Sequence, residues 1–230
     1  MMAKYFSATK AFRDGWNGFN LNAGTLVGFT VIATVVLALL QSIQYGLVTA
    51  SVNNIATTGE AQFGLAILLF AIALFQAITG LIISIALLDG SLSSIRGKRI
   101  GLPDLFGKIT EVPNLIGLQL FGGISIFLGF LTFIFPGVYL FVAFLFAGMV
   151  LVDKPQSFVD ALNISRRLVT PHWFDISLFL LVVAGIILLG YLACLIGGFV
   201  SVPVGFCMIA AAYKQLLILG DSSDQSKDLN

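Results

Sequence analysis

Long apolar stretches constrain the fold of this chain more than any other feature of its sequence. A helix that crosses a membrane needs about 20 mostly apolar residues, because the hydrocarbon core is about 30 Å thick and a helix rises about 1.5 Å per residue. Two stretches have this length, and two longer blocks, 115–152 and 176–219, have room for two spans each. The sequence therefore predicts an all-α polytopic membrane protein with six transmembrane helices, at about 24–47, 63–88, 115–134, 137–152, 176–197 and 201–219.

These spans are expected to form a single domain over 1–220, followed by a polar C-terminal tail over 221–230. Proline and glycine divide the two long blocks. Phe135-Pro136-Gly137 is the expected turn in the first block, because proline starts a helix better than it continues one and glycine accepts the backbone angles of turns. The expected break in the second block is marked by Gly197, Gly198 and Pro203.

Charged residues make up only 10% of the chain, less than half of their usual share in soluble domains. The lysines and arginines gather in the N-terminal segment, in 89–114, in 153–173 and towards the C-terminus. Six spans place these segments on one side of the membrane, whereas the connection at 49–62 carries Glu60 and no lysine or arginine. Positive residues are retained on the cytoplasmic side, so both termini are expected to be cytoplasmic. Four spans, with each long block as one kinked helix, would place 153–173 outside.

A short amphipathic helix is predicted just before the fifth span. Ser157 and Asp160 match the acidic form of a capping box, which marks the start of a helix. One face of the helix is then apolar, with Phe158, Ala161, Leu162, Leu168 and Val169. The other face is polar, with Asn163, Arg166 and Arg167. This pattern is typical of a helix in the headgroup region, and Trp173 follows as an expected interface anchor.

Two other segments repeat this pattern less clearly. Near the N-terminus, apolar residues recur at helical spacing at Tyr5, Ala8, Phe12 and Trp16. Between Pro103 and Pro113 the recurrence is weaker, at Leu105, Phe106, Ile109 and Val112. The sequence thus suggests three repeats, each an interfacial amphipathic helix followed by a membrane hairpin. The alternative is that amphipathic connectors are a general feature of proteins with several spans.

Small and polar residues form stripes within the expected spans. Gln76, Gly80 and Ser84 recur every four residues in the second span, and Gln41 lies in the first. The last two spans contain a similar series, with Gly190, Cys194 and Gly198. Such stripes either pack against another helix or face a water-lined cavity. Helix packing is favoured, because small residues and interhelical hydrogen bonds hold membrane helices together.

The sequence contains no recognisable catalytic or metal-binding motif. The lone His172 has no cluster of cysteines or carboxylates near it at metal-ligand spacing. There is also no nucleophile elbow and no phosphate-binding loop with a lysine. We therefore expect a protein that is not an enzyme and that needs no cofactor or metal. The net charge of +1 gives no reason to expect a nucleic-acid partner.

Two basic clusters are candidate contacts for anionic lipid headgroups. The first consists of Arg96, Lys98 and Arg99, and the second of Arg166 and Arg167. Basic residues next to membrane spans attract anionic lipids, although the same residues are also explained by topology alone. Besides the lipid bilayer, the expected partners are another membrane protein or a second copy of this chain.

One group of motifs resembles a known family over residues 130–215. The motifs are Phe135-Pro136-Gly137-Val138-Tyr139-Leu140, Phe146-Ala147, Val152-Asp153, Ala161-Leu162, Ser165-Arg166-Arg167-Leu168 and Trp173. They resemble the YciC-type family of bacterial inner-membrane proteins and the related membrane domain of some glycerophosphodiester phosphodiesterases. Where that family usually has a glycine before the histidine and tryptophan, this chain has Pro171.

The resemblance implies a six-span protein of the bacterial inner membrane. It makes Pro136, Gly137, Tyr139 and Asp153 signature positions, at the turn and at the end of the fourth span. It implies no catalytic residue, because the phosphodiesterases carry their chemistry in a separate soluble barrel. We therefore expect a non-catalytic membrane protein that organises lipids or partner proteins, in an accessory, assembly or envelope-homeostasis role.

Two alternatives remain at this point. The stripe of glutamine and serine would suit a transporter or channel for a neutral or lipid-like solute. An enzyme that acts on lipid headgroups around Asp153, Arg166, Arg167 and His172 is the weaker alternative.

Overall fold

The computed structural model describes residues 5–58, 63–154, 156–193 and 195–227, and these residues contain helices but no strand. The helices are α1 (Ala8–Leu21), α2 (Ala23–Thr58), α3 (Phe63–Ile95), η1 (Pro103–Phe106), η2 (Ile109–Glu111), α4 (Val112–Thr132), α5 (Ile134–Phe144), α6 (Ala147–Asp153), α7 (Phe158–Val169), η3 (Thr170–His172), α8 (Trp173–Ala193) and α9 (Leu195–Lys227). Six stretches within the described residues are long and apolar enough to cross a membrane. The predicted class, an all-α polytopic membrane protein, is confirmed.

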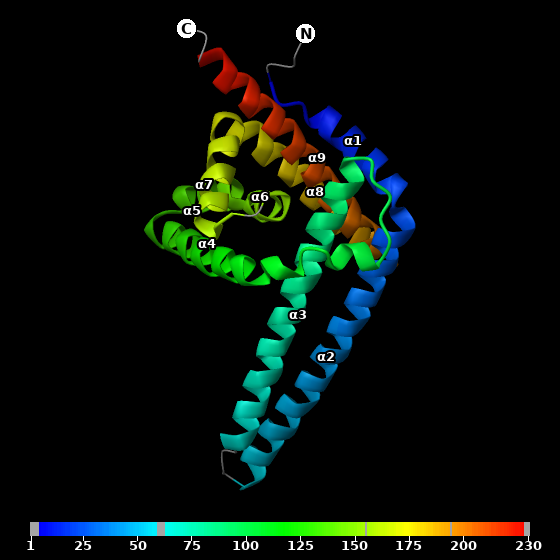
Figure 1. The fold of residues 1–230 in the computed structure, drawn as a ribbon. Coiled ribbons are helices and arrows are strands. Elements are labelled where there is room, and N and C mark those ends of the chain that lie inside the picture. The colour runs from blue at the N-terminus through cyan, green and yellow to red at the C-terminus, as the bar shows by residue number, and fades with distance from the viewer. Residues whose placement is uncertain (1–4, 59–62, 155, 194, 228–230) are drawn as a thin grey trace.

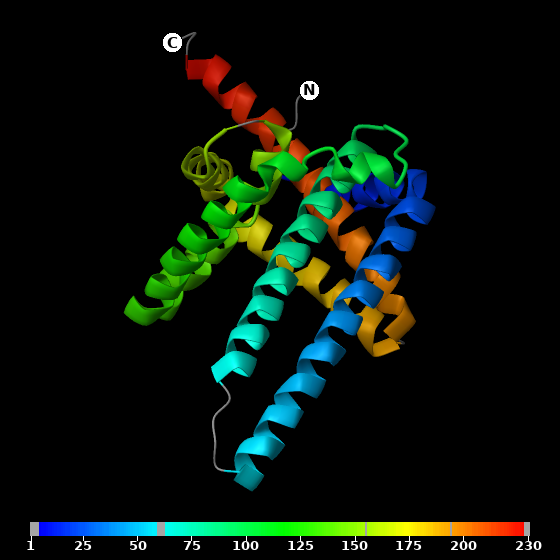
Figure 2. The same ribbon diagram turned by 60° about the horizontal axis from the view of Figure 1, so that its bottom comes forward.

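Three helical hairpins diverge from a shared base (Figures 1 and 2). They are α2–α3, α4–α5 and α8–α9, and the α2–α3 hairpin projects farthest from the rest of the molecule. Helix α6 lies inside the base, and every residue from Ala147 to Val152 is buried. Helix α1 packs across α9. We call the region in which α1, α6 and the three hairpins meet the base.

Helix α1 begins after Ser7, whose side chain caps it by accepting a hydrogen bond from the backbone of Lys10. Of its predicted apolar face, Ala8 and Phe12 pack against the core. Tyr5 and Trp16 are exposed, and the residues that α1 buries are Ala11, Gly15, Gly18 and Phe19. The cause is a close approach to α9: a Cβ atom at Gly15 would lie 2.6 Å from the Met208 Cα.

The amphipathic helix α7 forms as predicted. The Ser157 side chain accepts a hydrogen bond from the Asp160 backbone, and Ala161, Leu162 and Val169 are buried. The middle segment is different, because Pro103–Phe106 and Ile109–Glu111 form two short 3₁₀ helices, with Phe106 and Ile109 exposed. The suggested repeat thus has an amphipathic α-helix at its first and third copies, and 3₁₀ turns at the second.

The breaks between paired helices lie a few residues from their predicted positions. Helix α4 ends before Phe133, whose extended backbone forms the break, and Pro136 lies in the first turn of α5. Gly197, Gly198 and Pro203 do not separate the last two helices, because all three lie inside α9. Helix α8 ends at Ala193, and α9 begins at Leu195. Helix α9 also continues to Lys227, so the polar tail is helical over its described part.

Candidate functional site

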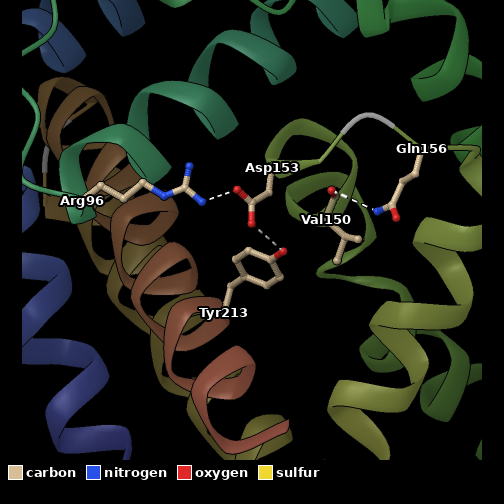
Figure 3. Close-up of polar contacts among 5 residues, drawn as sticks. All are labelled: Arg96, Val150, Asp153, Gln156 and Tyr213. Carbon is tan, nitrogen blue, oxygen red and sulfur yellow. Dashed lines mark hydrogen bonds and ion pairs between the residues drawn. The ribbon is translucent and has the colours of Figure 1, made fainter. Parts of the chain in front are cut away.

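A polar junction joins three helices at the base (Figure 3). Asp153 ends α6, Arg96 follows the end of α3, and Tyr213 lies on α9. The Arg96 guanidinium forms an ion pair with Asp153 Oδ1. The Tyr213 hydroxyl donates a hydrogen bond of 3.2 Å to Asp153 Oδ2. The Asp153 side chain is only 7% exposed, so both carboxylate oxygens are satisfied within the protein.

This junction is structural in character. A buried carboxylate is costly unless donors surround it, and here one donor comes from α3 and another from α9. The Tyr213 ring also stacks on Phe146, with ring centroids 6.4 Å apart. The Gln156 side chain donates a hydrogen bond to the Val150 carbonyl near the end of α6. Arg96, a candidate headgroup contact, also helps to hold the base together, and its side chain is 42% exposed.

A groove with basic walls runs between α7, η3 and α9. It has a volume of about 840 Å³ and combines polar with apolar walls. We call it the basic groove, and define it by Asn163, Arg166, Arg167, His172, Leu216 and Leu219. Arg166 and Arg167 lie in the last turn of α7 and are exposed. The groove thus brings the second predicted basic cluster together with His172, beside leucines of α9.

Thr170 links the basic groove to α5. Its hydroxyl donates a hydrogen bond of 2.6 Å to the Arg166 carbonyl, and it lies 3.0 Å from the hydroxyl of the signature residue Tyr139. The Tyr139 ring also contacts Trp173, with ring centroids 6.3 Å apart. An apolar hollow of about 420 Å³ lies beside this contact and is lined by Phe135, Pro136, Tyr139 and Trp173.

Within the first predicted stripe, Gln76 contacts another helix, whereas Gly80 does not pack closely against one and Ser84 bonds within its own helix. The Gln76 amide donates a hydrogen bond of 2.6 Å to Gln41 Oε1 and so joins α2 to α3. The Ser84 hydroxyl donates a hydrogen bond to the Gly80 carbonyl of its own helix, and a Cβ added at Gly80 would meet open space.

Glycines of the second stripe lie where α8 and α9 approach each other closely. A Cβ at Gly198 would lie 2.6 Å from the Tyr191 ring, and one at Gly190 would lie 2.5 Å from Ser201 Cβ. Cys194 lies outside the described residues.

Lys98 and Arg99 are exposed at the end of α3, as a headgroup contact requires. Asn22 holds their segment in place, and sequence reasoning missed it. The Asn22 amide donates to Ser94 Oγ at 2.9 Å and to the Lys98 carbonyl at 2.8 Å, and its oxygen accepts from the Ile100 backbone at 3.0 Å. No local pattern marks this residue, because its partners lie more than 70 positions away.

The site offers little for metal chemistry. Across the part of the chain that the structure describes, no three His, Cys, Asp or Glu side chains group closely enough to hold a metal ion. Its chemical resources are instead the two exposed arginines and His172, which can bind an anion, and the adjoining apolar walls.

Comparisons with known proteins find uncharacterised bacterial relatives. An uncharacterised protein of Mycobacterium bovis is 28% identical over 230 aligned residues, which cover 92% of this chain and 69% of that protein. Uncharacterised proteins from two strains of Mycobacterium tuberculosis match to the same extent. The chain is a multi-pass membrane protein. Its relatives are bacterial. No family model matches the chain, and no solved structure matches it.

Proposed function

We propose that this chain is a non-catalytic protein of the bacterial inner membrane that holds anionic lipid in the basic groove. Both termini then face the cytoplasm. Its role is that of an accessory, assembly or envelope-homeostasis protein. The resemblance to the YciC-type family supports this location and adds no activity of its own.

The distribution of basic residues supports the orientation. Arg96, Lys98, Arg99, Arg166 and Arg167 all lie on segments at the base from which the hairpins diverge. The Lys214 ammonium also lies there, because it donates a hydrogen bond to the Ile95 carbonyl at the end of α3. Positive residues stay on the cytoplasmic side, so the base is the cytoplasmic part of the protein.

The observation that carries the proposal is the pairing of cations with apolar walls in the basic groove. The cations are Arg166 and Arg167 of α7, and the apolar walls come from Leu216 and Leu219 of α9, with His172 beside them. An anionic lipid offers a phosphate for the arginines and apolar carbons for the leucines. Arginine binds phosphate through several parallel donors, which favours a headgroup over a diffuse counterion.

The transport alternative has less support. It rested on the polar groups of Gln41 and Gln76, and these side chains form a hydrogen bond with each other. A glutamine pair that joins two helices needs no solute to explain it.

Native mass spectrometry of the full chain in mild detergent tests the proposal. Phosphatidylglycerol should bind more tightly than phosphatidylcholine. The double variant Arg166→Gln/Arg167→Gln should bind phosphatidylglycerol about 30-fold more weakly, since each basic residue near a lipid surface contributes about 1 kcal/mol. The matched control Arg13→Gln/Lys108→Gln removes the same charge elsewhere and should bind normally. Equal loss in both variants, or no preference for phosphatidylglycerol, would contradict the proposal.

A further inference from the structure

The tips of the α2–α3 and α4–α5 hairpins have opposite character. The sequence at the α2–α3 tip is polar, with Asn53, Asn54, Thr57, Thr58, Glu60 and Gln62. The α4–α5 tip exposes large apolar side chains, which are Leu131, Phe133, Ile134 and Phe135, each more than 70% exposed. Thr132, the polar residue of this tip, bonds its hydroxyl to the Leu128 carbonyl. A tip of this composition is poorly suited to emerge into water.

An apolar tip alone does not show whether a hairpin crosses the membrane, because the α8–α9 turn is apolar too. Helix α8 contains 21 residues from Trp173 onward, which gives about 30 Å, enough to cross the hydrocarbon core. Helix α5 contains 11 residues before it breaks at Leu145, which gives only about 16 Å. Helix α4 has 21 residues like α8, so it is the second arm, α5, that limits the reach of the α4–α5 hairpin.

Helix α7 packs lengthwise along the α4–α5 hairpin. At its beginning, the Phe158 ring lies 6.3 Å from that of Phe121 on α4. In its middle, the Ser165 hydroxyl donates a hydrogen bond of 2.6 Å to the Ala143 carbonyl on α5. Beyond its end, Thr170 lies 3.0 Å from the Tyr139 hydroxyl. The hairpin thus follows a helix whose exposed face carries two arginines.

The contact between Tyr139 and Thr170 limits how deep the tip lies. Thr170 and Trp173 follow the arginines of α7, and a tryptophan in this position marks the membrane interface. Tyr139 is beside them, and the first residue of α5, Ile134, is only five positions away. Five helical residues span about 7.5 Å. A tip on the far side of the membrane would lie about 30 Å from this interface.

We infer that the α4–α5 hairpin enters the cytoplasmic leaflet and ends within it, with its apolar tip among the lipid acyl chains. Both ends of the hairpin return to the cytoplasmic side. The basic segment 153–173 therefore stays on the cytoplasmic side, where positive residues are retained. Figure 1 shows that the α4–α5 and α2–α3 hairpins leave the base in different directions. The interaction surface is the tip, and its partner is the acyl region of one leaflet. This inference does not depend on lipid binding in the basic groove.

Cysteine labelling in membranes tests the depth of the tip. The full chain would carry Cys194→Ala, and Cys207 can remain because it is fully buried. Phe135→Cys, at a position 81% exposed, should resist a membrane-impermeant maleimide from outside intact cells and on inverted vesicles, and should react after detergent is added. The matched control Val52→Cys, near the end of α2, should react from outside. Reaction of Phe135→Cys from outside would overturn the inference.

A second variant addresses the case in which the tip crosses the membrane but its cysteine does not react with the maleimide. It tests the depth of the hairpin by crosslinking. With Tyr139→Cys and Thr170→Cys in one chain, a short thiol crosslinker should join the two positions in membranes. Thr170→Cys alone should react with the maleimide on inverted vesicles. In a hairpin that crosses, these positions lie far apart, so absence of the crosslink, or reaction of Thr170→Cys from outside only, would also overturn the inference.

Discussion

The α2–α3 and α4–α5 hairpins are held together in different ways. In α4–α5 the helices approach closely at glycine, since a Cβ at Gly129 would lie 3.0 Å from the Gly137 Cα. In α2–α3 no atom would lie within 4 Å of a Cβ at Gly46 or Gly80, and the helices share the hydrogen bond between Gln41 and Gln76. The α4–α5 hairpin thus relies on close backbone packing, whereas the α2–α3 hairpin relies on a polar contact.

The polar junction at the base should give the largest effect, because it connects α3, α6 and α9. Asp153→Ala removes the acceptor of both Arg96 and Tyr213. Two donors then lose their partner, and we expect a loss of about 2–3 kcal/mol in the free energy of unfolding. Thermal unfolding in detergent would show it as a lower Tm. A Tm within one degree of that of the unaltered chain would mean that the junction does not hold the base.

A pair of glycine variants tests the difference in packing directly. Gly129→Val should destabilise the α4–α5 hairpin by about 1–3 kcal/mol, because overpacking at a close contact forces the helices apart. Gly80→Val should have little effect on stability, since space is open there. Both would be measured by denaturant unfolding in the same detergent. Equal losses in the two variants would remove the distinction between the hairpins.

The glutamine pair should give the smallest effect. Gln76→Leu leaves Gln41 without its partner and should lower stability by about 0.6–1 kcal/mol, the usual value of one hydrogen bond between membrane helices. In the double variant Gln41→Leu/Gln76→Leu both polar groups are gone, so part of this loss should be recovered. A double-mutant cycle measures the coupling, and a coupling of zero would show that the hydrogen bond does not join α2 to α3.

Sequence reasoning succeeded where the signal was local. The capping pair Ser157 and Asp160 identified the start of α7, and the apolar stretches identified all six long helices. It failed where contacts between distant segments decide the outcome. Hydrophobic spacing marked Trp16 as part of the apolar face of an interfacial helix, but α1 packs against α9 through Gly15, where the absence of a side chain lets α9 approach. Apolar periodicity does not detect a contact made by glycine.

The candidate site shows the same limit. The sequence marked Arg96 and Asp153 separately, one as a headgroup contact and the other as a span end. Their ion pair joins residues 57 positions apart, so no local pattern predicts it. Arg166 and Arg167 were marked as a cluster, but the leucines that complete the basic groove come from α9. Local sequence patterns therefore predicted the charged residues of the groove, whereas its apolar walls become evident only in the folded structure.

The side of the membrane on which the base lies is the most direct test of this account. Single cysteines would replace Arg99 at the base and Val52 near the α2–α3 tip, in the chain with Cys194→Ala, and both would be probed with a membrane-impermeant maleimide. We predict that Val52→Cys reacts in intact cells and that Arg99→Cys reacts only on inverted vesicles. Reaction of Arg99→Cys in intact cells would place the base and its basic groove outside, and would contradict the orientation on which both proposals depend.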